Sequence, residues 1–206
     1  MCGPKEIVRA GYDQAAESYL AARPSDGGDV ALLADLRARV PDGSPVLDAG
    51  CGAGMPVTDA LVSMGLRAVG LDFSPGQLTL ARRRHLAATC VRGDLAALPF
   101  ADGSFAAVVS YYAIIHVPRD EHATVVREVS RVLWPGGWAL LCLGLGDLVD
   151  DHDPESWLGV PMYWSHFGAD VNVALVRDAG LHVEWTREVP DPMSHGAHLF
   201  VLAERR

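Results

Sequence analysis

Three aspartates follow short apolar runs in the first half of this 206-residue chain. Asp48 stands in VLDAGCGAG, Asp72 in VGLDFS and Asp94 in VRGDLAALPF. A carboxylate at the end of a strand can accept hydrogen bonds from both hydroxyls of a ribose. It can also accept a hydrogen bond from the exocyclic amine of an adenine. Asp72 and Asp94 are therefore candidates for nucleoside recognition. The alternative for each is an acid that only stabilises a turn or a helix N-terminus.

The glycines after Asp48 indicate what kind of ligand the turn accommodates. Gly50, Gly52 and Gly54 alternate with other residues, and glycine allows a tight turn and a close approach to a ligand. A dinucleotide fingerprint, G-x-G-x-x-G, would need a third glycine where the chain has Met55. A carboxylate beside a pyrophosphate is unfavourable, whereas it suits an ammonium group. The spacing therefore favours a cationic ligand over NAD.

Apolar runs that alternate with helical patterns predict the elements that position these residues. Alternation of strand and helix favours a mostly parallel sheet with helices on both faces, and ligands bind beyond the carboxyl ends of its strands. The last two strands are separated only by a turn near 190–196, which makes them an antiparallel hairpin. The expected strands are PVLDAG, RAVGLD, TCVRGD, FAAVVSYY, WALLCLGLG, LHVEWTREV and HLFVLAE.

Helical periodicity and turn residues predict the remaining organisation. Ser74 is expected to cap a helix whose first residue is Pro75. The length favours one domain over 1–206, with an N-terminal helical cap (1–43), a core (44–145), a long irregular loop (146–170) and a C-terminal helix and hairpin (171–206). Helices are expected over about 5–22, 28–40, 54–64, 74–85, 118–134 and 170–180.

Taken together, four segments resemble the successive motifs of class I S-adenosyl-L-methionine (SAM)-dependent methyltransferases, of the small single-domain type 11 or 25. The resemblance covers roughly residues 12–143, and the remainder in outline. It implies SAM as the cofactor and an α/β fold, a Rossmann-like three-layer αβα sandwich. The seven-stranded sheet is expected in the order 3-2-1-4-5-7-6, with strand 7 antiparallel and the N-terminal helices as a lid. The segments are VLDAGCGAG, VGLDFS, GDLAALPFADGSFAAVVSYYAIIHV and RVLWPGGWALL.

The resemblance also implies roles for individual residues. Gly50, Gly52 and Gly54 are expected beside the methionine part of SAM, Asp72 at the ribose, and Asp94 with Leu95 at the adenine. Further cofactor contacts are expected from neighbours in the same motifs: Asp48, Ala49, Cys51, Met55, Phe73, Gly93, Ser110 and Tyr111.

The N-terminal helix carries the pattern Y-D-x-x-A-x-x-Y, which begins at Tyr12 and ends at Tyr19. In similar enzymes such a helix covers the cofactor and a tyrosine reaches the sulfonium region, so both tyrosines are expected to contact SAM. The alternative is that they are core aromatics on an amphipathic helix.

The acceptor side is expected beyond the fourth strand and in the segment 146–170. His116 and His166 are the candidate general bases, because a base assists transfer to a hydroxyl or a protonated amine. A structural role for His116 is the alternative. An aromatic and methionine-rich loop can form an apolar acceptor pocket. The residues expected to bind the acceptor are Tyr112, Trp157, Met162, Trp164, Ser165 and His198.

Composition restricts the partners. Lys plus Arg is 17 and Asp plus Glu is 26, a formal charge of −9, which disfavours a broad nucleic-acid surface. The four cysteines make no C-x-x-C pair, and no apolar run is long enough to span a membrane, so a cytoplasmic protein without a metal site is expected. The chain gives no indication of its oligomeric state, so a monomer and a homodimer both remain open.

These observations predict transfer of a methyl group from SAM to an oxygen or nitrogen of a small molecule, with S-adenosylhomocysteine as the second product. The alternative is a protein with the same fold that does not transfer methyl, such as a cyclase-like catalyst or a SAM-binding regulatory module, because fold does not fix function.

Overall fold

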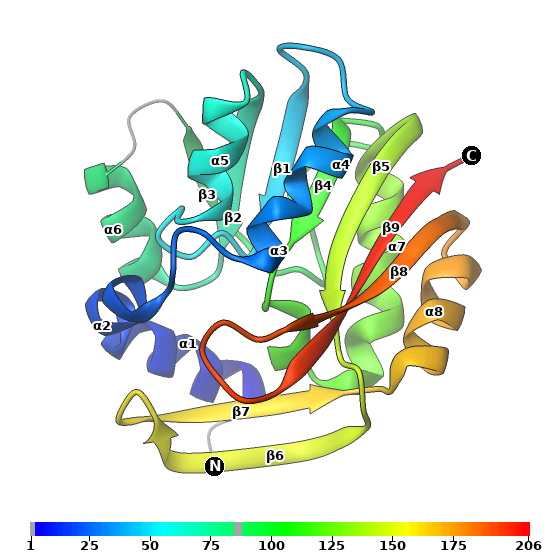
Figure 1. Ribbon diagram of the computed structural model, residues 1–206. Coiled ribbons are helices and arrows are strands. Elements are labelled where there is room, and N and C mark those ends of the chain that lie inside the picture. The colour runs from blue at the N-terminus through cyan, green and yellow to red at the C-terminus, as the bar shows by residue number, and fades with distance from the viewer. Residues whose placement is uncertain (1–2, 85–87) are drawn as a thin grey trace.

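The computed structural model describes residues 3–84 and 88–206, apart from the side chains of 154–156. Seven strands form one sheet in the order β3-β2-β1-β4-β5-β9-β8 (Figure 1). β9 runs antiparallel to both of its neighbours, and the other pairs are parallel. The predicted order, the antiparallel last strand and the C-terminal hairpin are confirmed. The strands are β1 (Pro45–Ala49), β2 (Arg67–Asp72), β3 (Thr89–Arg92), β4 (Phe105–Ser110), β5 (Leu133–Leu143), β8 (Leu181–Pro190) and β9 (Ala197–Arg205).

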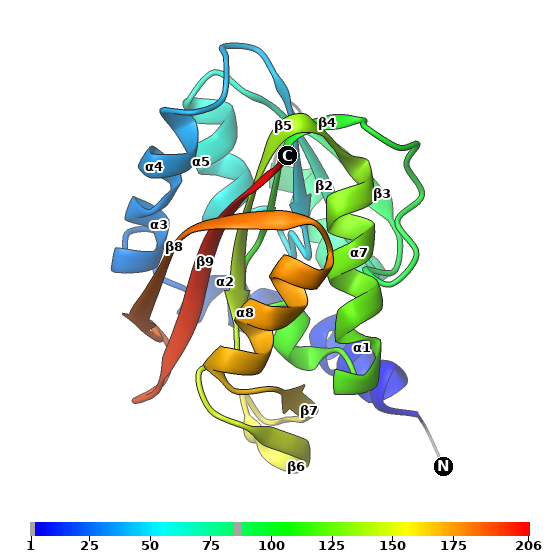
Figure 2. The ribbon, with the colours of Figure 1, turned by 90° about the vertical axis from the view of Figure 1, so that its right-hand side faces the viewer.

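Helices cover both faces of this sheet (Figure 2). One face is packed by α7 and α8 through buried valines, and the other by α4 and α5 through buried leucines, so two apolar layers enclose the sheet. The helices are α1 (Pro4–Gln14), α2 (Ala16–Ala22), α3 (Gly28–Ala31), α4 (Leu33–Arg37), α5 (Val57–Ser63), α6 (Pro75–Arg84), α7 (His122–Val132) and α8 (Ala169–Asp178), with the 3-10 turns η1 (Ile114–His116) and η2 (Arg119–Glu121).

The central strands are buried along their length, as expected for parallel strands covered on both faces. Every residue of β4 is buried, and β1 is buried from Val46 to Ala49, so the first strand carries Asp48 into the interior with 1% of its surface exposed. Asp48 lies opposite Gly70 of β2, and Asp72 lies opposite Arg92 of β3. The carboxyl ends of β1, β2 and β3 therefore meet at one edge.

The N-terminal helices differ from the single helix expected over 5–22. Ala15 leaves the helical conformation with φ −88° and ψ 7°, and this break separates α1 from α2. Because of it, α1 lies across the carboxyl ends of the strands while both helices contact α6 (Figure 1). The expected helix over 28–40 is likewise divided into α3 and α4 at Leu32.

The cap of α6 is confirmed. The Ser74 hydroxyl accepts a hydrogen bond from the Gln77 amide at 3.1 Å, and the helix begins at Pro75. Its expected end near His85 lies outside the described residues, as does Cys2. Cys51, Cys90 and Cys142 are free thiols. Within the described part of the chain, no helix is long and apolar enough to cross a membrane.

The prediction of a long irregular loop over 146–170 is wrong. This segment forms a separate antiparallel pair, β6 (Leu148–Trp157) and β7 (Val160–His166), below the main sheet (Figure 1). Its two-residue turn, Leu158 and Gly159, has φ values of 52° and 75°. Such turns favour Asn-Gly or Asp-Gly, and a leucine at the first position conceals the hairpin from sequence analysis.

The β6–β7 hairpin packs against α1. A Cβ at Gly11 would lie 2.5 Å from the Pro161 carbonyl oxygen, so the close approach of helix and strand depends on glycine. Together, α1 and the hairpin enclose the carboxyl edge of the sheet.

Candidate active site

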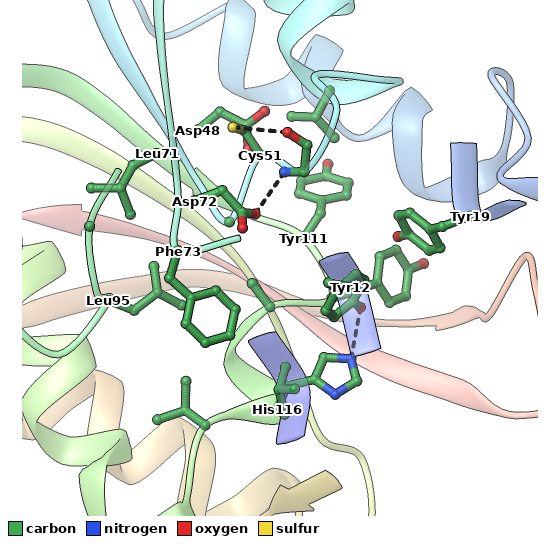
Figure 3. Close-up of a pocket in the computed structure, with 18 of the residues that line it drawn as sticks. Tyr12, Tyr19, Asp48, Cys51, Leu71, Asp72, Phe73, Leu95, Tyr111 and His116 are labelled. Atoms are coloured by element: carbon green, nitrogen blue, oxygen red, sulfur yellow. Dashed lines mark hydrogen bonds between the residues drawn. The ribbon is translucent and has the colours of Figure 1, made fainter. Parts of the chain in front are cut away.

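A cavity of about 870 Å³ lies at the carboxyl ends of β1 to β4, beneath α1 (Figure 3). Fifteen of the residues singled out in the sequence line it: Tyr12, Tyr19, Asp48, Gly50, Cys51, Gly52, Met55, Asp72, Phe73, Gly93, Asp94, Leu95, Tyr111, Tyr112 and His116. We call it the rim cavity.

The glycine turn after β1 forms one wall. Gly50 has a φ of +90°, and a Cβ there would lie 2.2 Å from the Cβ of Ala113, so no other residue fits. The Gly52 amide donates to one oxygen of Asp72 at 2.9 Å, and the Ser74 amide donates to the other at 2.9 Å. The turn and the second strand are thus tied through Asp72, whose carboxylate is fixed in orientation.

Two acids, Asp48, which is buried, and Asp72, which is partly buried, give this cavity its electrostatic character. Burial raises the pKa of Asp48 to about 7, although the Thr58 hydroxyl, which donates to it at 2.6 Å, lowers that pKa. Burial of the carboxyl group also raises the pKa of Asp72 to about 6, although the backbone hydrogen bonds that this group accepts lower that pKa. A cation bound in the cavity would relieve both penalties, because opposite charge favours the ionised form.

The Asp48 shift predicts a pH dependence of stability for the ligand-free protein. Because the folded protein holds this proton more tightly than the unfolded chain, the stabilising contribution is complete near pH 4 and is lost as pH rises through about 7. Asp48→Asn cannot ionise. The free energy of unfolding of the parent should therefore fall relative to that of Asp48→Asn between pH 4 and 7, by up to roughly 1.4 kcal/mol per pH unit. Urea titrations of both proteins measure this, and parallel pH profiles would contradict it.

Asp94 lies at the other end of the rim cavity. One of its oxygens accepts from the Ala96 amide at 2.9 Å, and the other accepts from the Lys5 ammonium at 2.8 Å. Lys5 also reaches Glu121 at 2.5 Å. This ammonium connects α1 to the loop after β3 and to η2.

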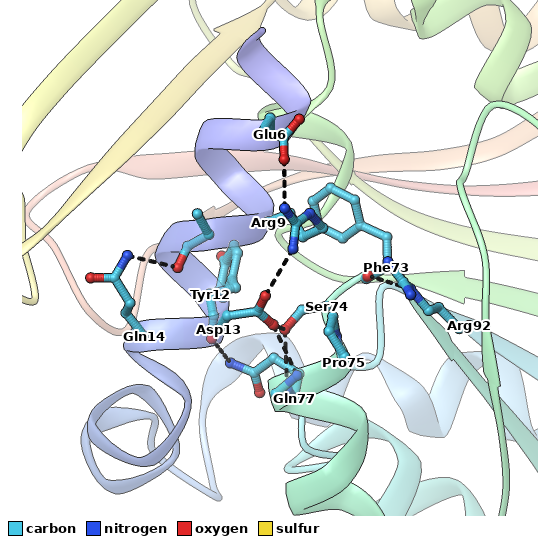
Figure 4. A network of polar contacts seen from close by, with 12 residues as sticks. Glu6, Arg9, Tyr12, Asp13, Gln14, Phe73, Ser74, Pro75, Gln77 and Arg92 are labelled. Carbon is cyan, nitrogen blue, oxygen red and sulfur yellow. Dashed lines mark hydrogen bonds and ion pairs between the residues drawn. The ribbon is translucent and has the colours of Figure 1, made fainter. Parts of the chain in front are cut away.

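A second connection holds the other end of α1 (Figure 4). One oxygen of Asp13 accepts hydrogen bonds from the Ser74 hydroxyl at 2.6 Å and from the Gly76 amide at 2.9 Å. A Cβ at Gly76 would lie 3.0 Å from the Cα of Asp13, so the helix and the start of α6 are closely packed. The aspartate of the Y-D-x-x-A-x-x-Y pattern therefore positions the lid helix.

A smaller cavity of about 350 Å³ adjoins the first, on the side of the hairpin and the β8–β9 turn. We call it the aromatic cavity, because five aromatic residues line it together with Ile115 and Met193. Tyr12, Tyr19, Arg23, Tyr112 and His116 line both cavities. The aromatic residues of this cavity are Tyr12, Tyr19, Tyr112, Trp157 and Trp164.

Tyr12 and His116 form a pair at the boundary of the two cavities (Figure 3). The Tyr12 hydroxyl lies 3.0 Å from Nε2 of His116, and Nδ1 of His116 lies 2.8 Å from the Tyr163 carbonyl oxygen. The ring of Trp157 lies against Tyr12 with centroids 5.0 Å apart, and the ring of Trp164 lies 5.6 Å from that of His116. The hairpin thus brings both tryptophans to the predicted side.

The structure places four predicted acceptor-side residues outside both cavities. His166 sits at the end of β7 and its Nδ1 donates to the Gly146 carbonyl at 2.8 Å, so it does not reach the boundary. Ser165 points to the opposite side of the strand from Trp164 and donates to Asp150. Met162 is buried beneath α1. His198 is 3.1 Å from Asp191 and contacts Tyr112 edge-on.

Three predicted cofactor residues also lie behind the cavity wall. Ala49 is buried in β1, and the Ser110 hydroxyl donates to its carbonyl at 2.8 Å. The Gly54 amide closes the turn on the Cys51 carbonyl at 2.9 Å. These residues shape the rim without lining it.

Arg23 is the main cavity residue that the sequence analysis missed. It is 4% exposed and pairs with Asp29, and its Nη1 is buried without a hydrogen-bond partner among the described residues. Arg23 directly follows α2 with an extended backbone, so helical periodicity gives no signal that could have identified it. Lys5, Asp191 and Met193 also line the cavities, but they stand in no motif or periodic pattern that would identify them in the sequence.

Residues 46–137 match the family described as a methyltransferase domain. Among curated proteins, the chain is 40% identical over 109 residues to a demethylmenaquinone methyltransferase of Renibacterium salmoninarum, covering 52% of this chain and 43% of that protein. It is 34% identical over 132 residues to a sterol 24-C-methyltransferase of Pneumocystis carinii, covering 58% and 33%. An uncharacterized methyltransferase of Synechocystis is 37% identical over 119 residues, covering 58% and 52%. The chain thus spans about a third to a half of the length of these relatives.

Solved structures share the fold over nearly the whole chain. The 1,6-didemethyltoxoflavin-N1-methyltransferase of Burkholderia thailandensis, solved with 1,6-didemethyltoxoflavin and S-adenosylhomocysteine, has a TM-score of 0.75 and 19% identity, covering 100% of this chain and 91% of that one. The [4+2]-cyclase SpnF has a TM-score of 0.74 and 18% identity, covering 98% and 96%. In the methyltransferase domain matched over residues 46–137, in its strand order and in its rim of glycines and aspartates, the chain is similar to class I SAM-dependent methyltransferases.

Proposed function

We propose that the protein transfers a methyl group from SAM in the rim cavity to an oxygen or nitrogen of a small molecule in the aromatic cavity. The observation that supports this most directly is the shared boundary of the two cavities, where Tyr12 and His116 line both. A transfer between two bound molecules needs such a junction, because proximity and orientation supply much of the catalysis.

The residues of the rim cavity fit SAM. Asp72 would accept the ribose hydroxyls, and Asp48 lies where it would face the ammonium group of the methionine part, beside the Gly50 turn. The unpartnered Nη1 of Arg23 suits the carboxylate of that methionine part, since a buried guanidinium nitrogen favours an anionic acceptor. When bound, SAM supplies an electrophilic methyl group on a sulfonium.

At the adenine end, Asp94 and Leu95 would contact the base. Both oxygens of Asp94 already accept hydrogen bonds, one of them from Lys5. Binding of an exocyclic amine at Asp94 therefore requires Lys5 to share or leave this carboxylate, which would loosen its connection between α1 and the loop after β3.

The aromatic cavity suits a small acceptor that combines an aromatic or apolar body with polar groups, because Arg23, His116 and Asp191 line it beside the aromatic side chains. Trp157, Trp164 and Tyr112 supply aromatic surface, and Ile115 and Met193 also line the cavity. The relatives named above act, by their names, on a sterol, on demethylmenaquinone and on 1,6-didemethyltoxoflavin. The net charge of −9 also disfavours a nucleic-acid acceptor. We further propose a cytoplasmic location, which the free thiols of the described cysteines support.

A binding and transfer assay tests the proposal. S-adenosylhomocysteine is expected to bind with a micromolar or tighter Kd by calorimetry, and to raise the Tm more at pH 8 than at pH 5, because ionised Asp48 favours the ammonium group of this ligand. Tritium from methyl-labelled SAM should then appear in the small-molecule fraction of a cell extract. Absence of binding at millimolar ligand would contradict the cofactor assignment. Binding without transfer would favour the second candidate, a catalyst such as the cyclase that shares this fold.

A further inference from the structure

The boundary between the two cavities limits where an acceptor can release a proton. Five residues line both cavities: Tyr12, Tyr19, Arg23, Tyr112 and His116. An acceptor whose reacting atom faces the rim cavity has these side chains around it. The proton acceptor for a hydroxyl or N–H group is therefore to be sought among them.

The hydrogen bonds of His116 fix its tautomer. A carbonyl oxygen can only accept, so Nδ1, at 2.8 Å from the Tyr163 carbonyl, carries a hydrogen. Burial lowers the pKa of His116 to about 4, so the ring is neutral at pH 7 and Nε2 bears a lone pair. Nε2 lies 3.0 Å from the Tyr12 oxygen, so the Tyr12 hydroxyl donates to it. The oxygen of Tyr12 is left with its lone pairs to accept from elsewhere.

The other shared residues offer no comparable base. The Tyr112 hydroxyl donates to Asp29 at 3.2 Å, and Arg23 is a cation paired with the same carboxylate. Burial raises the pKa of Tyr19 to about 12. The neutral imidazole of His116 is thus the one base among the five, and Tyr12 occupies its free nitrogen.

Several charged or titratable side chains surround His116 and affect its protonation. Tyr12 faces it from α1, and Arg23 and Asp191 line the same aromatic cavity. His166 of β7 and His198 of β9 act on it at longer range and disfavour its protonation. Although burial opposes it, hydrogen bonds from His198 and Met193 lower the pKa of Asp191 to about 2, which makes that carboxylate a weak base.

We propose that Tyr12 and His116 form a proton relay in which Tyr12 contacts the acceptor and His116 receives the proton. The proposal rests on the proposed function. The acceptor atom forms a bond to the methyl carbon while the electrons of the carbon–sulfur bond return to sulfur. The acceptor proton passes to the Tyr12 oxygen, and the Tyr12 hydrogen passes to Nε2 of His116. The products are the methylated acceptor, S-adenosylhomocysteine and an imidazolium.

The relay conserves the charge of the enclosed site. One positive charge is lost at sulfur and one is gained at His116, so no net charge has to be moved into or out of the buried boundary. The relay also defines the acceptor class, because an O–H or N–H group has a proton to lose, whereas a tertiary amine or a thioether has none.

The first test examines the tautomer without any cofactor. Nitrogen-15 NMR of the histidine side chains in the full chain, with His116 assigned by its loss in His116→Asn, should show the Nδ1–H form at neutral pH. In Tyr12→Phe the Nε2 resonance should shift, because its hydrogen-bond donor is removed. An Nε2–H tautomer in the parent would overturn the relay.

The second test measures transfer of tritium from methyl-labelled SAM into the extract between pH 6 and 9. Tyr12→Phe is expected to lower the rate about 100-fold or more, the usual range for proton-transfer catalysis, while the Kd for S-adenosylhomocysteine changes less than about threefold. Ser18→Ala, which removes a hydroxyl from α2 outside both cavities, should keep the parental rate. A Tyr12→Phe rate within threefold of the parent would overturn the relay alone. No transfer by the parent, despite binding, would overturn the proposed function.

Discussion

Replacing Asp72 by alanine is expected to weaken binding of S-adenosylhomocysteine by at least about 100-fold. Asp72 is oriented by amides of the glycine turn and of Ser74, with its remaining lone pairs available to two ribose hydroxyls. A hydrogen bond to a charged group contributes about 1.5–3 kcal/mol, so losing two corresponds to roughly 3 kcal/mol or more, and every 1.4 kcal/mol is a factor of ten in Kd. Calorimetric titration measures the change.

The control for this prediction is Asp178→Asn, which removes the same charge from an exposed site at the end of α8. Asp72→Asn is a second variant that keeps the shape of the side chain and one acceptor oxygen, and it should bind with intermediate affinity. Circular dichroism establishes that each variant folds. Parental affinity in a folded Asp72→Ala protein would remove Asp72 from the cofactor site.

Replacing Asp29 by asparagine is expected to lower the free energy of unfolding by about 3–5 kcal/mol. Arg23 and Asp29 form an ion pair with 4% and 1% of their surfaces exposed, and Asp29 also accepts from the Tyr112 hydroxyl. Removing one partner of such a pair leaves an uncompensated charge in the interior, which costs about this much. Urea denaturation monitored by fluorescence gives the difference.

The double variant Arg23→Met/Asp29→Asn separates this cause from loss of packing. It contains no unpaired charge, so it should be more stable than Asp29→Asn alone, although it lacks more native contacts. A single variant within 1 kcal/mol of the parent, or a double variant less stable than the single one, would show that an unpaired Arg23 charge is not the cause of the lost stability.

The rim cavity was predictable because its determinants are local in sequence. Glycines that require positive φ, and aspartates that end apolar runs, identify the carboxyl ends of successive strands, and parallel pairing brings those ends together. The order of the sheet followed from the resemblance and agreed with the short connection before β9. Asp48, Asp72 and Asp94 therefore lie where the sequence predicts.

The acceptor side was less predictable, because it depends on a hairpin whose turn has no sequence signature. Once Leu158 and Gly159 form that turn, the two-residue period of β7 brings Trp164 to the cavity and turns Ser165 away, and the length of the strand carries His166 past the boundary. Arg23 required tertiary information of another kind, since its partner Asp29 approaches only after the chain reverses between α2 and α3.

The hairpin that covers the site has a consequence for how such enzymes diversify. Among the described residues, β6 and β7 pair as strands with each other and with no strand of the main sheet, and β7 meets the rest of the molecule mainly at α1 and η1. An exchange or lengthening of this segment during evolution would leave every ladder of the seven-stranded sheet intact, and with it the glycine turn and the three aspartates. Selection can therefore alter the preferred acceptor by changing one contiguous insert, while recognition of the methyl donor is inherited unchanged.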